Sequence, residues 1–313
     1  MSGQETVLEL FAGIGGMACA WPEAADVVAV DINRSAAELY RSNFPHLYVI
    51  SGLDGGGAHN RLLGDLWHRS TWWMSPPCQP FTHRGKRRDV DDPRSAALQT
   101  CIDAIERCRP RWIAMENVAA FRNSKACRRL IETLERSRYH YQTLDLCATE
   151  LGWPNRRPRF YLVAGLDRPR AWRRRPFYRI SLEAFLETDE AVHPDLWIDE
   201  ATTKRYHSAI DRVMPGDPRQ STACFTASYG KYVVHSGSYL QIECKGGGWR
   251  LRRFSPREVA RLLGFPDTYR FDAQNRRAMW KMLGNSLSLP AARYILSHLP
   301  HGPNPELPWW SRD

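Results

Sequence analysis

The sequence has no long hydrophobic run and no CxxC pair, and acidic residues are fewer than basic ones. No apolar stretch is long enough to cross a membrane, and the stretch Met1 to Leu10 carries two acids, so we expect neither a transmembrane helix nor a signal peptide. The eight cysteines show no disulfide-like spacing, which disfavours a structural zinc site and indicates free thiols in a reducing compartment. We therefore expect a soluble cytoplasmic protein with no metal and no membrane partner.

What the sequence does have is positive charge and length. Lys and Arg number 44 against 34 Asp and Glu, a formal net charge of +10, so a polyanionic partner such as nucleic acid is plausible. A chain of 313 residues can bury one large core and a smaller one. No obligate protein partner is evident.

The first βα unit is predicted at the N-terminal end. The apolar run Thr6–Leu10 breaks into a glycine turn over residues 11–16, and a helix follows from Met17. The turn reads G-x-G-G rather than G-x-G-x-x-G, so a dinucleotide is not specifically indicated. A second strand over residues 27–30 ends in Asp31, which either grips a ribose diol or caps a helix over residues 33–43.

A rigid cysteine loop follows the next predicted strand, residues 71–74. Two prolines precede Cys78 and one follows it, and each restricts the backbone, so Cys78 is either a positioned nucleophile or an incidental buried thiol. A further strand over residues 112–115 leads directly into Glu116-Asn117-Val118. Glu116 is either a pocket carboxyl or the partner in a cap or ion pair.

Four predicted strands thus each end in a chemically notable group: the glycine turn, Asp31, Cys78 and Glu116. In an open parallel α/β sheet, ligands bind at the carboxyl edge, so helical crossovers would gather these groups around one crevice. Helical spacing over residues 95–107 and 289–299 supplies candidate packing helices.

Five ordered motifs resemble those of the cytosine-5 methyltransferases of the DNA methyltransferase type. They are Phe11-Ala12-Gly13-Ile14-Gly15-Gly16, Pro76-Pro77-Cys78-Gln79-Pro80-Phe81, Glu116-Asn117-Val118, Asn155-Arg156-Arg157-Pro158-Arg159 and Gly284-Asn285-Ser286. Within that family the chain most resembles the branch that methylates the cytosine at position thirty-eight in the anticodon loop of tRNA-Asp. Asn155, the Cys224-Phe225-Thr226 triplet and the compact length carry that resemblance.

The resemblance implies a Rossmann-like class I fold that uses S-adenosylmethionine. It implies that Cys78 attacks C6 of the cytosine, that Glu116 holds a proton toward N3, and that Arg157 and Arg159 lie over the base and its phosphate. Residues implied to bind the cofactor are Phe11, Ala12, Gly13, Gly15, Gly16, Asp31, Ile32, Pro76 and Asn285. Many members of that family place an acidic residue after the third strand, where it binds the adenine amino group. This sequence has no convincing equivalent, because Asp54 is near that position but does not align with it. Residues implied to bind the substrate are Gln79, Arg84, Lys86, Arg87, Cys224, Phe225 and Thr226.

The resemblance also implies two domains: a cofactor-binding catalytic domain over 1–165 plus 285–313, and a target-recognition region over 166–284. Aromatic residues of that region either stack on unpaired bases or form its core; they are Trp172, Phe177, Tyr229, Tyr232 and Tyr239. The substrate is expected to be tRNA. The alternatives are a DNA cytosine-5 methyltransferase with the same chemistry and a non-catalytic nucleic-acid-binding module.

Overall fold

The structure, a computed structural model, describes residues 6–24, 26–53, 64–81, 89–172, 178–188, 193–217, 219–244, 247–271 and 275–304. These residues fall into two compact units, neither continuous in sequence. The first unit lies within Met1–Leu146, Pro158–Arg174 and Ala291–Leu307, and the second within Cys147–Arg157 and Arg175–Pro290. The prediction placed the changeovers at residues 165 and 285, whereas the chain passes between units near residues 147, 158, 175 and 291.

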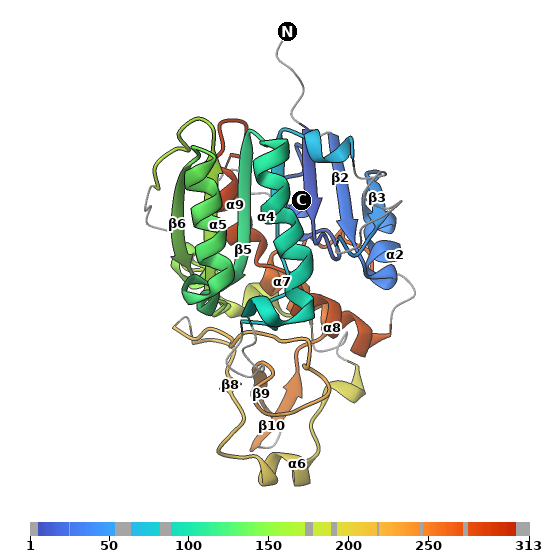
Figure 1. Ribbon diagram of the computed structural model, residues 1–313. Helices are drawn as coiled ribbons and strands as arrows, with labels where there is room; N and C mark the ends of the chain where they lie inside the picture. Colours follow the sequence, from blue (N-terminus) through green and yellow to red (C-terminus); the bar gives the residue numbers. More distant parts are fainter. Residues whose placement is uncertain are drawn as a thin grey trace. The chain divides into compact units, whose positions relative to one another are not determined.

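The first unit is built on a seven-stranded sheet with the order β3-β2-β1-β4-β5-β7-β6 (Figure 1). The strands β3, β2, β1, β4 and β5 pair in parallel, and β7 runs antiparallel to both β5 and β6. The bounds of the strands are β1 Thr6–Leu10, β2 Asp26–Asp31, β3 Leu47–Ile50, β4 Thr71–Met74, β5 Trp112–Val118, β6 His140–Leu146 and β7 Arg159–Gly165. The predicted α/β fold is confirmed, and β7 runs opposite to the other six strands of this sheet.

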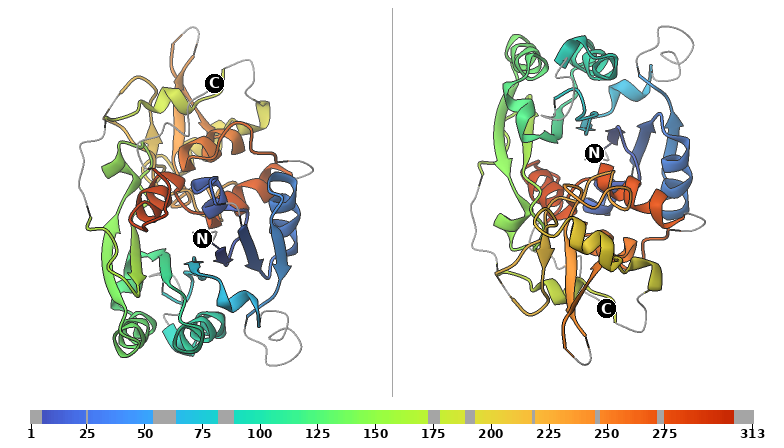
Figure 2. Two further views of the ribbon diagram at one scale, coloured as in Figure 1. Left: turned by 90° about the horizontal axis from the view of Figure 1, so that it is seen from above. Right: turned by 90° about the horizontal axis from the view of Figure 1, so that it is seen from below.

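Helices cover both faces of this sheet. Figure 2 shows α4 and α5 on one face and α9 on the other. The helix α1 lies beside α9, because Arg293 of α9 donates to the carbonyl of Ala20 at 2.9 Å. The helices carrying residues of this unit are α1 Gly16–Ala20, α2 Arg34–Asn43, α4 Ala96–Cys108, α5 Lys125–Arg136 and α9 Leu289–Leu296.

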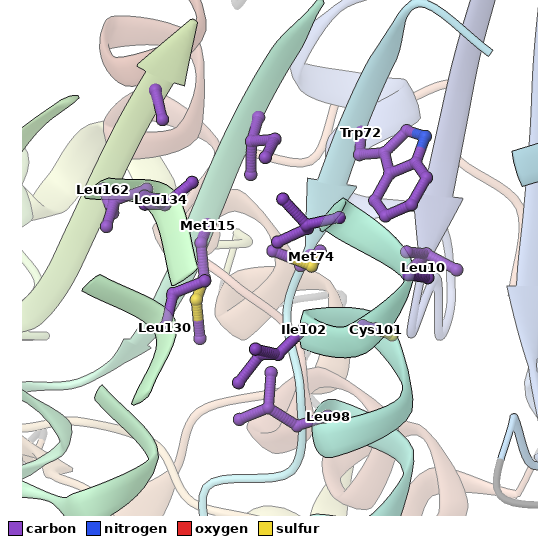
Figure 3. Packing of buried hydrophobic residues seen from close by; sticks show 14 of the residues in the cluster. Leu10, Trp72, Met74, Leu98, Cys101, Ile102, Met115, Leu130, Leu134 and Leu162 are labelled. Carbon is purple, nitrogen blue, oxygen red and sulfur yellow. The ribbon is translucent and has the colours of Figure 1, made fainter. Parts of the chain in front are cut away.

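The core of the first unit lies between the sheet and α4 and α5. Every residue of β4 is buried, as expected for a parallel strand covered on both faces, which explains its uninterrupted apolar sequence. Figure 3 shows Met74 and Met115 from the strands on the side where Leu98 and Ile102 of α4 lie, and Trp72 farther along the sheet near Leu10. The predicted apolar face of residues 95–107 therefore packs as its helical spacing indicates.

The second unit contains a three-stranded sheet with the order β10-β9-β8. Its strands are β8 Arg212–Val213, β9 Tyr239–Glu243 and β10 Trp249–Arg253, and its helices are α6 Glu200–Arg205, α7 Pro256–Leu263 and α8 Arg276–Asn285. The helix α7 begins at a capping box, in which Ser255 accepts from the Glu258 amide and Glu258 accepts from the Ser255 amide. Arg252 of β10 and Glu258 of α7 form a buried ion pair at 2.8 Å.

Short 3₁₀ segments complete the described chain: η1 Leu66–His68, η2 Asp89–Asp91, η3 Pro93–Ser95, η4 Ala119–Asn123, η5 Ala148–Leu151, η6 Leu182–Phe185 and η8 Pro194–Leu196. Within the described ranges, no helix is long and apolar enough to cross a membrane.

Candidate active site

The glycine turn after β1 is held by the end of β2. The amide of Gly13 donates to Asp31 Oδ2 at 2.9 Å, and the amide of Ala12 donates to the carbonyl of Val30 at 3.0 Å. Gly13 has φ +53°, and a methyl group at its Cα would meet no atom within 4 Å. Phe11 also has a positive φ, 61°, which is rare for an aromatic residue and typical of a functional turn. The turn therefore presents open space beside its backbone.

Asp31 links this turn to the start of α2. Its second oxygen, Oδ1, accepts from the amide of Asn33 at 2.8 Å. Burial raises the pKa of Asp31, and the two amide hydrogen bonds oppose that shift. The N-cap of α2 is Asn33, whose side chain accepts from the amide of Ala36, so Asp31 is not the cap that one prediction allowed. Ile32, beside it, is exposed.

The cysteine loop is anchored on both sides. Ser75 Oγ donates to the carbonyl of Phe11 at 3.1 Å, which ties the loop to the glycine turn. On the other side, Asn117 Nδ2 of β5 donates to the carbonyl of Pro76 at 3.2 Å. The amide of Phe81 donates to the carbonyl of Cys78 at 3.0 Å and closes the turn. Cys78 is thus held at the carboxyl edge of β4 with its side chain partly exposed.

Cys78 differs from the thiols that only pack. Cys101 of α4 and Cys127 of α5 are buried in the core of the first unit. Burial raises the pKa of the Cys127 thiol to about 11 and raises the pKa of the Cys101 thiol further. Such thiols remain protonated near neutral pH and are poor nucleophiles. Cys78 is partly exposed beside the cation of Arg94, whose raised pKa is due first to its hydrogen bond with Asp92 and in part to the nearby Cys78.

Arg94 and Asp92 are residues that sequence reasoning missed. The Arg94 guanidinium donates to both carboxylate oxygens of Asp92, at 2.8 and 2.6 Å, and to Gln79 Oε1 at 2.9 Å. Gln79 neighbours the cysteine, so this bidentate clamp fixes a positive charge against the cysteine loop. The signal was an arginine and two acids in Asp91-Asp92-Pro93-Arg94, just before a predicted helix.

Glu116 lies inside β5 rather than after it. The strand continues to Val118 because β7 pairs with it along its whole length. Arg159 of β7 projects back to Glu116, and its Nε lies 2.9 Å from Glu116 Oε1, with both side chains largely buried. A carboxyl group paired with a guanidinium at a strand edge can hold and orient a proton donor or acceptor.

Arg157 belongs to the second unit. Its side chain is only 3% exposed, and one guanidinium nitrogen donates to the carbonyl of Phe225 and lies 3.2 Å from Cys224 Sγ. The other donates to the carbonyls of Gly284, at 3.4 Å, and Ser286. Arg157 thus joins the predicted Cys224–Thr226 triplet to the end of α8, where the exposed Asn285 lies.

The structure divides the predicted site residues between the two units. The first unit brings together Phe11, Ala12, Gly13, Gly15, Gly16, Asp31, Ile32, Pro76, Cys78, Gln79, Glu116 and Arg159. The second carries Arg157, Cys224, Phe225, Thr226 and Asn285. Arg84, Lys86, Arg87 and Asp54 lie outside the described residues.

A family model described as C-5 cytosine-specific DNA methylase matches residues 6–189 and 197–301. This chain belongs to that family. Members of the C-5 cytosine methylase family are S-adenosylmethionine-dependent methyltransferases, and the chain is therefore an enzyme of this class.

Similar proteins in the C-5 cytosine methylase family include a tRNA (cytosine(38)-C(5))-methyltransferase of Schizosaccharomyces pombe. It is 32% identical and is matched over 94% of this chain and 96% of its own. The enzyme of the same name from Mus musculus is 29% identical over 95% and 93% of the two chains. Among solved structures, the S. pombe Dnmt2 methyltransferase aligns with a TM-score of 0.81 and 30% identity, covering 93% of this chain and 97% of that one.

Several of these residues fit the cofactor that the family requires. The glycine turn leaves space for a ligand beside its backbone, because Gly13 has a positive φ and no atom lies within 4 Å of the position that a Cβ would take. Asp31 offers carboxylate oxygens at the end of β2, the position at which nucleotide-type folds bind a ribose diol. Both features lie at the carboxyl edge of adjacent parallel strands.

Proposed function

We propose that this enzyme methylates C5 of a cytosine in tRNA, the cytosine at position thirty-eight in the anticodon loop of tRNA-Asp, through a covalent bond between Cys78 and C6. The observation that carries this proposal is similarity of about 30% identity, over nearly the full length of both chains, to proteins named tRNA (cytosine(38)-C(5))-methyltransferases. The anchored Cys78 loop and the Glu116–Arg159 pair support the chemistry.

Cys78 supplies the nucleophile in the proposed reaction. Cytosine C5 is a weak nucleophile, and addition of the Cys78 thiolate to C6 moves the electrons of the C5–C6 double bond onto C5. When bound, S-adenosylmethionine supplies the electrophilic methyl group that C5 accepts. Loss of the C5 proton to a base and breakage of the Sγ–C6 bond then restore the aromatic ring and the free thiol.

Glu116 and Arg159 act on the other side of the base in this proposal. Glu116 holds a proton toward N3, which stabilises the ring as the thiolate adds. Arg159 keeps the Glu116 carboxyl in place through its 2.9 Å contact. Arg94 places positive charge beside the thiolate and orders Gln79 against the substrate.

The cofactor is proposed to lie across the glycine turn. Phe11, Gly13 and Asp31 would hold its methionine and ribose parts, and the exposed Ile32 would cover the adenine. The remaining residues of the first unit proposed to shape this site are Ala12, Gly15, Gly16 and Pro76. Asn285, also predicted to bind the cofactor, belongs to the second unit.

Substrate recognition is assigned to the second unit and to the basic segment after Cys78. A target base must leave its stack to reach the thiol, and a loop nucleotide is easier to extrude than a paired one. We propose that Cys224 and Thr226 contact the tRNA, with Arg157 as the positioning residue beneath them. Phe225, which the sequence also assigned to substrate binding, is buried and packs against Tyr229 and Phe254. Arg84, Lys86 and Arg87 are proposed to contact phosphates.

The test supplies methyl-labelled S-adenosylmethionine with a tRNA-Asp transcript, the same transcript with uridine at position thirty-eight, or duplex DNA. Label is expected only in the first. The Cys78→Ala variant should transfer none, whereas Cys108→Ala, which removes another partly exposed thiol of the first unit, should retain transfer.

A transcript containing 5-fluorocytosine tests the covalent step, because fluorine at C5 cannot leave as a proton does. The wild type should form a protein–RNA adduct that survives denaturing electrophoresis, and Cys78→Ala should form none. Label in DNA alone would overturn the tRNA assignment, and label with no adduct would overturn the role of Cys78.

A further inference from the structure

The small sheet of the second unit carries a cavity that the proposed chemistry does not use. It has a volume of about 750 Å³ and lies between β9, the start of β10 and the segment that follows β8. The side chains that matter for its chemistry are Met214, Asp217, Arg219, Gln241, Glu243 and Trp249. All of them belong to the second unit.

Trp249 is the most unusual of these residues, because 55% of it is exposed. Seven other tryptophans are at most 6% exposed: Trp21, Trp67, Trp72, Trp73, Trp112, Trp153 and Trp280. Met214, on the same cavity, is 37% exposed. The Trp249 ring and the Met214 thioether are thus both exposed to solvent on the wall of one cavity. Such an exposed apolar wall indicates a surface that binds a flat apolar group.

Polar groups surround this apolar wall and offer both kinds of hydrogen bond. Glu243 lies directly opposite Trp249 in the β9–β10 register. The carboxylates of Glu243 and Asp217 can accept hydrogen bonds. Arg219 donates: its Nε lies 3.3 Å from Asp217 Oδ1, and its side chain is 88% exposed. Gln241 provides an amide beside Met214 Sδ. A nucleobase presents the complementary set, a planar ring with donors and acceptors along one edge.

Arginine side chains lie at the cavity. Arg219 lines it, and Arg179 donates to the carbonyls of Arg219 and Gln220. Arg250, next to Trp249 in β10, points to the other face of the sheet and stacks on Trp197 instead. Arginines beside an exposed aromatic ring are typical of proteins that bind single-stranded nucleic acid, in which bases stack and phosphates are neutralised.

We propose that this cavity is a second nucleotide-binding site, in which an unpaired base of the RNA substrate, other than the target cytosine, stacks on Trp249. The proposal rests on the proposed tRNA substrate. Asp217 and Glu243 accept hydrogen bonds from an exocyclic amino group, so guanine, adenine and cytosine are favoured over uracil. The site acts on affinity and leaves the chemical step unchanged.

The test measures binding of a fluorescein-labelled tRNA-Asp transcript by anisotropy, without cofactor, so it does not depend on methyl transfer. Stacking of one base predicts that Trp249→Ala weakens binding about 5- to 150-fold, while Trp249→Phe stays close to the wild type. The matched control is Tyr178→Ala, because Tyr178 is an aromatic residue of the second unit that is 98% exposed and lies outside the cavity. It should bind as the wild type does.

A set of transcripts, each with one abasic site at an unpaired nucleotide, identifies the base. One abasic site should weaken binding to the wild type as much as Trp249→Ala does and should cost the variant nothing further. Unchanged affinity of Trp249→Ala, or equal losses in both proteins at every abasic site, would overturn the second site alone. If the wild type bound duplex DNA and no tRNA, the proposed tRNA substrate would be wrong as well.

Discussion

The two compact units of this enzyme are stabilised by different kinds of contact. In the first, parallel strands of apolar residues are covered by helices on both faces, and β4 is buried throughout. In the second, an interior of mostly apolar residues also holds buried charges: Arg252 pairs with Glu258 at side-chain exposures of 2% and 0%, and Arg157 bonds to carbonyl groups. Non-directional burial tolerates small shifts, whereas buried charges require every partner in place.

The largest effect is expected from Glu116, which Arg159 contacts at the carboxyl end of the first unit's sheet. Glu116→Gln keeps the shape of the side chain but removes its acid function, so kcat for methyl transfer should fall about 10²- to 10⁴-fold. The matched control is Glu106→Gln, which alters an exposed ion pair with Arg136. Steady-state transfer of labelled methyl groups measures both. A Glu116→Gln enzyme with wild-type kcat would exclude Glu116 from the reaction.

The second unit should respond to charge removal by losing stability. Glu258→Gln leaves Arg252 buried without a counter-charge, so the free energy of unfolding in urea should fall by about 3–5 kcal/mol. Asp267→Asn breaks a more exposed pair with Arg261 and should cost at most about 1 kcal/mol. The double variant Arg252→Met/Glu258→Gln should recover part of the loss. Equal costs for the two single variants would show that burial does not set the cost of losing a charge in the second unit.

One buried acid in the first unit sharpens the comparison. Burial raises the pKa of Glu9 to about 8, while a hydrogen bond from Tyr40 opposes the shift, and no cation is among the groups that shift it. Because the folded state binds this proton more tightly than the unfolded state, stability is lost as pH rises from about 4.5 to about 8. The loss is at most about 1.4 kcal/mol per pH unit.

Glu9→Gln removes this titration. Urea unfolding at pH 5 and pH 8 should therefore show a smaller decrease with pH for Glu9→Gln than for the wild type. Parallel pH profiles for the two proteins would show that Glu9 is not the group responsible.

The smallest effects are expected from one glycine of each unit. A methyl group at Gly284 would lie 2.2 Å from the carbonyl carbon of Thr226, so Gly284→Ala should lower the free energy of unfolding by about 1–3 kcal/mol. In Gly13→Ala the new methyl group would contact no atom, so only the positive φ should lower the free energy of unfolding, by about 1 kcal/mol. Thermal or urea unfolding compares the two. A larger loss for Gly13→Ala would contradict the open space beside the glycine turn.

The first unit could be predicted largely from sequence. The strands at 6–10, 71–74 and 112–115 were recognisable because parallel strands covered on both faces are short, uninterrupted apolar runs. The extension of β5 through Glu116 was not recognisable, because it depends on pairing with β7, more than forty residues later in the chain. Arg94 was missed for a similar reason, since its role depends on a contact with Gln79.

The recognition region was harder to interpret. Tyr229 and Tyr239 were equally compatible with stacking on bases and with packing, and the structure buries both, whereas Tyr232 is exposed. Trp172 packs against His298 in the first unit rather than in the recognition region. Composition does not distinguish a core aromatic residue from a binding one, because both require the same ring.

By itself, the sequence determined the parallel strands, the rigid Cys78 loop and the family of the enzyme, because each depends on local apolar runs or on residues adjacent in the chain. Only the tertiary structure decided that Arg159 pairs with Glu116 while Arg157, two positions earlier, holds the Cys224 segment in the other unit. It also decided that Trp249 faces a cavity. These outcomes depend on which distant segments supply partners, and spacing along the chain does not encode that.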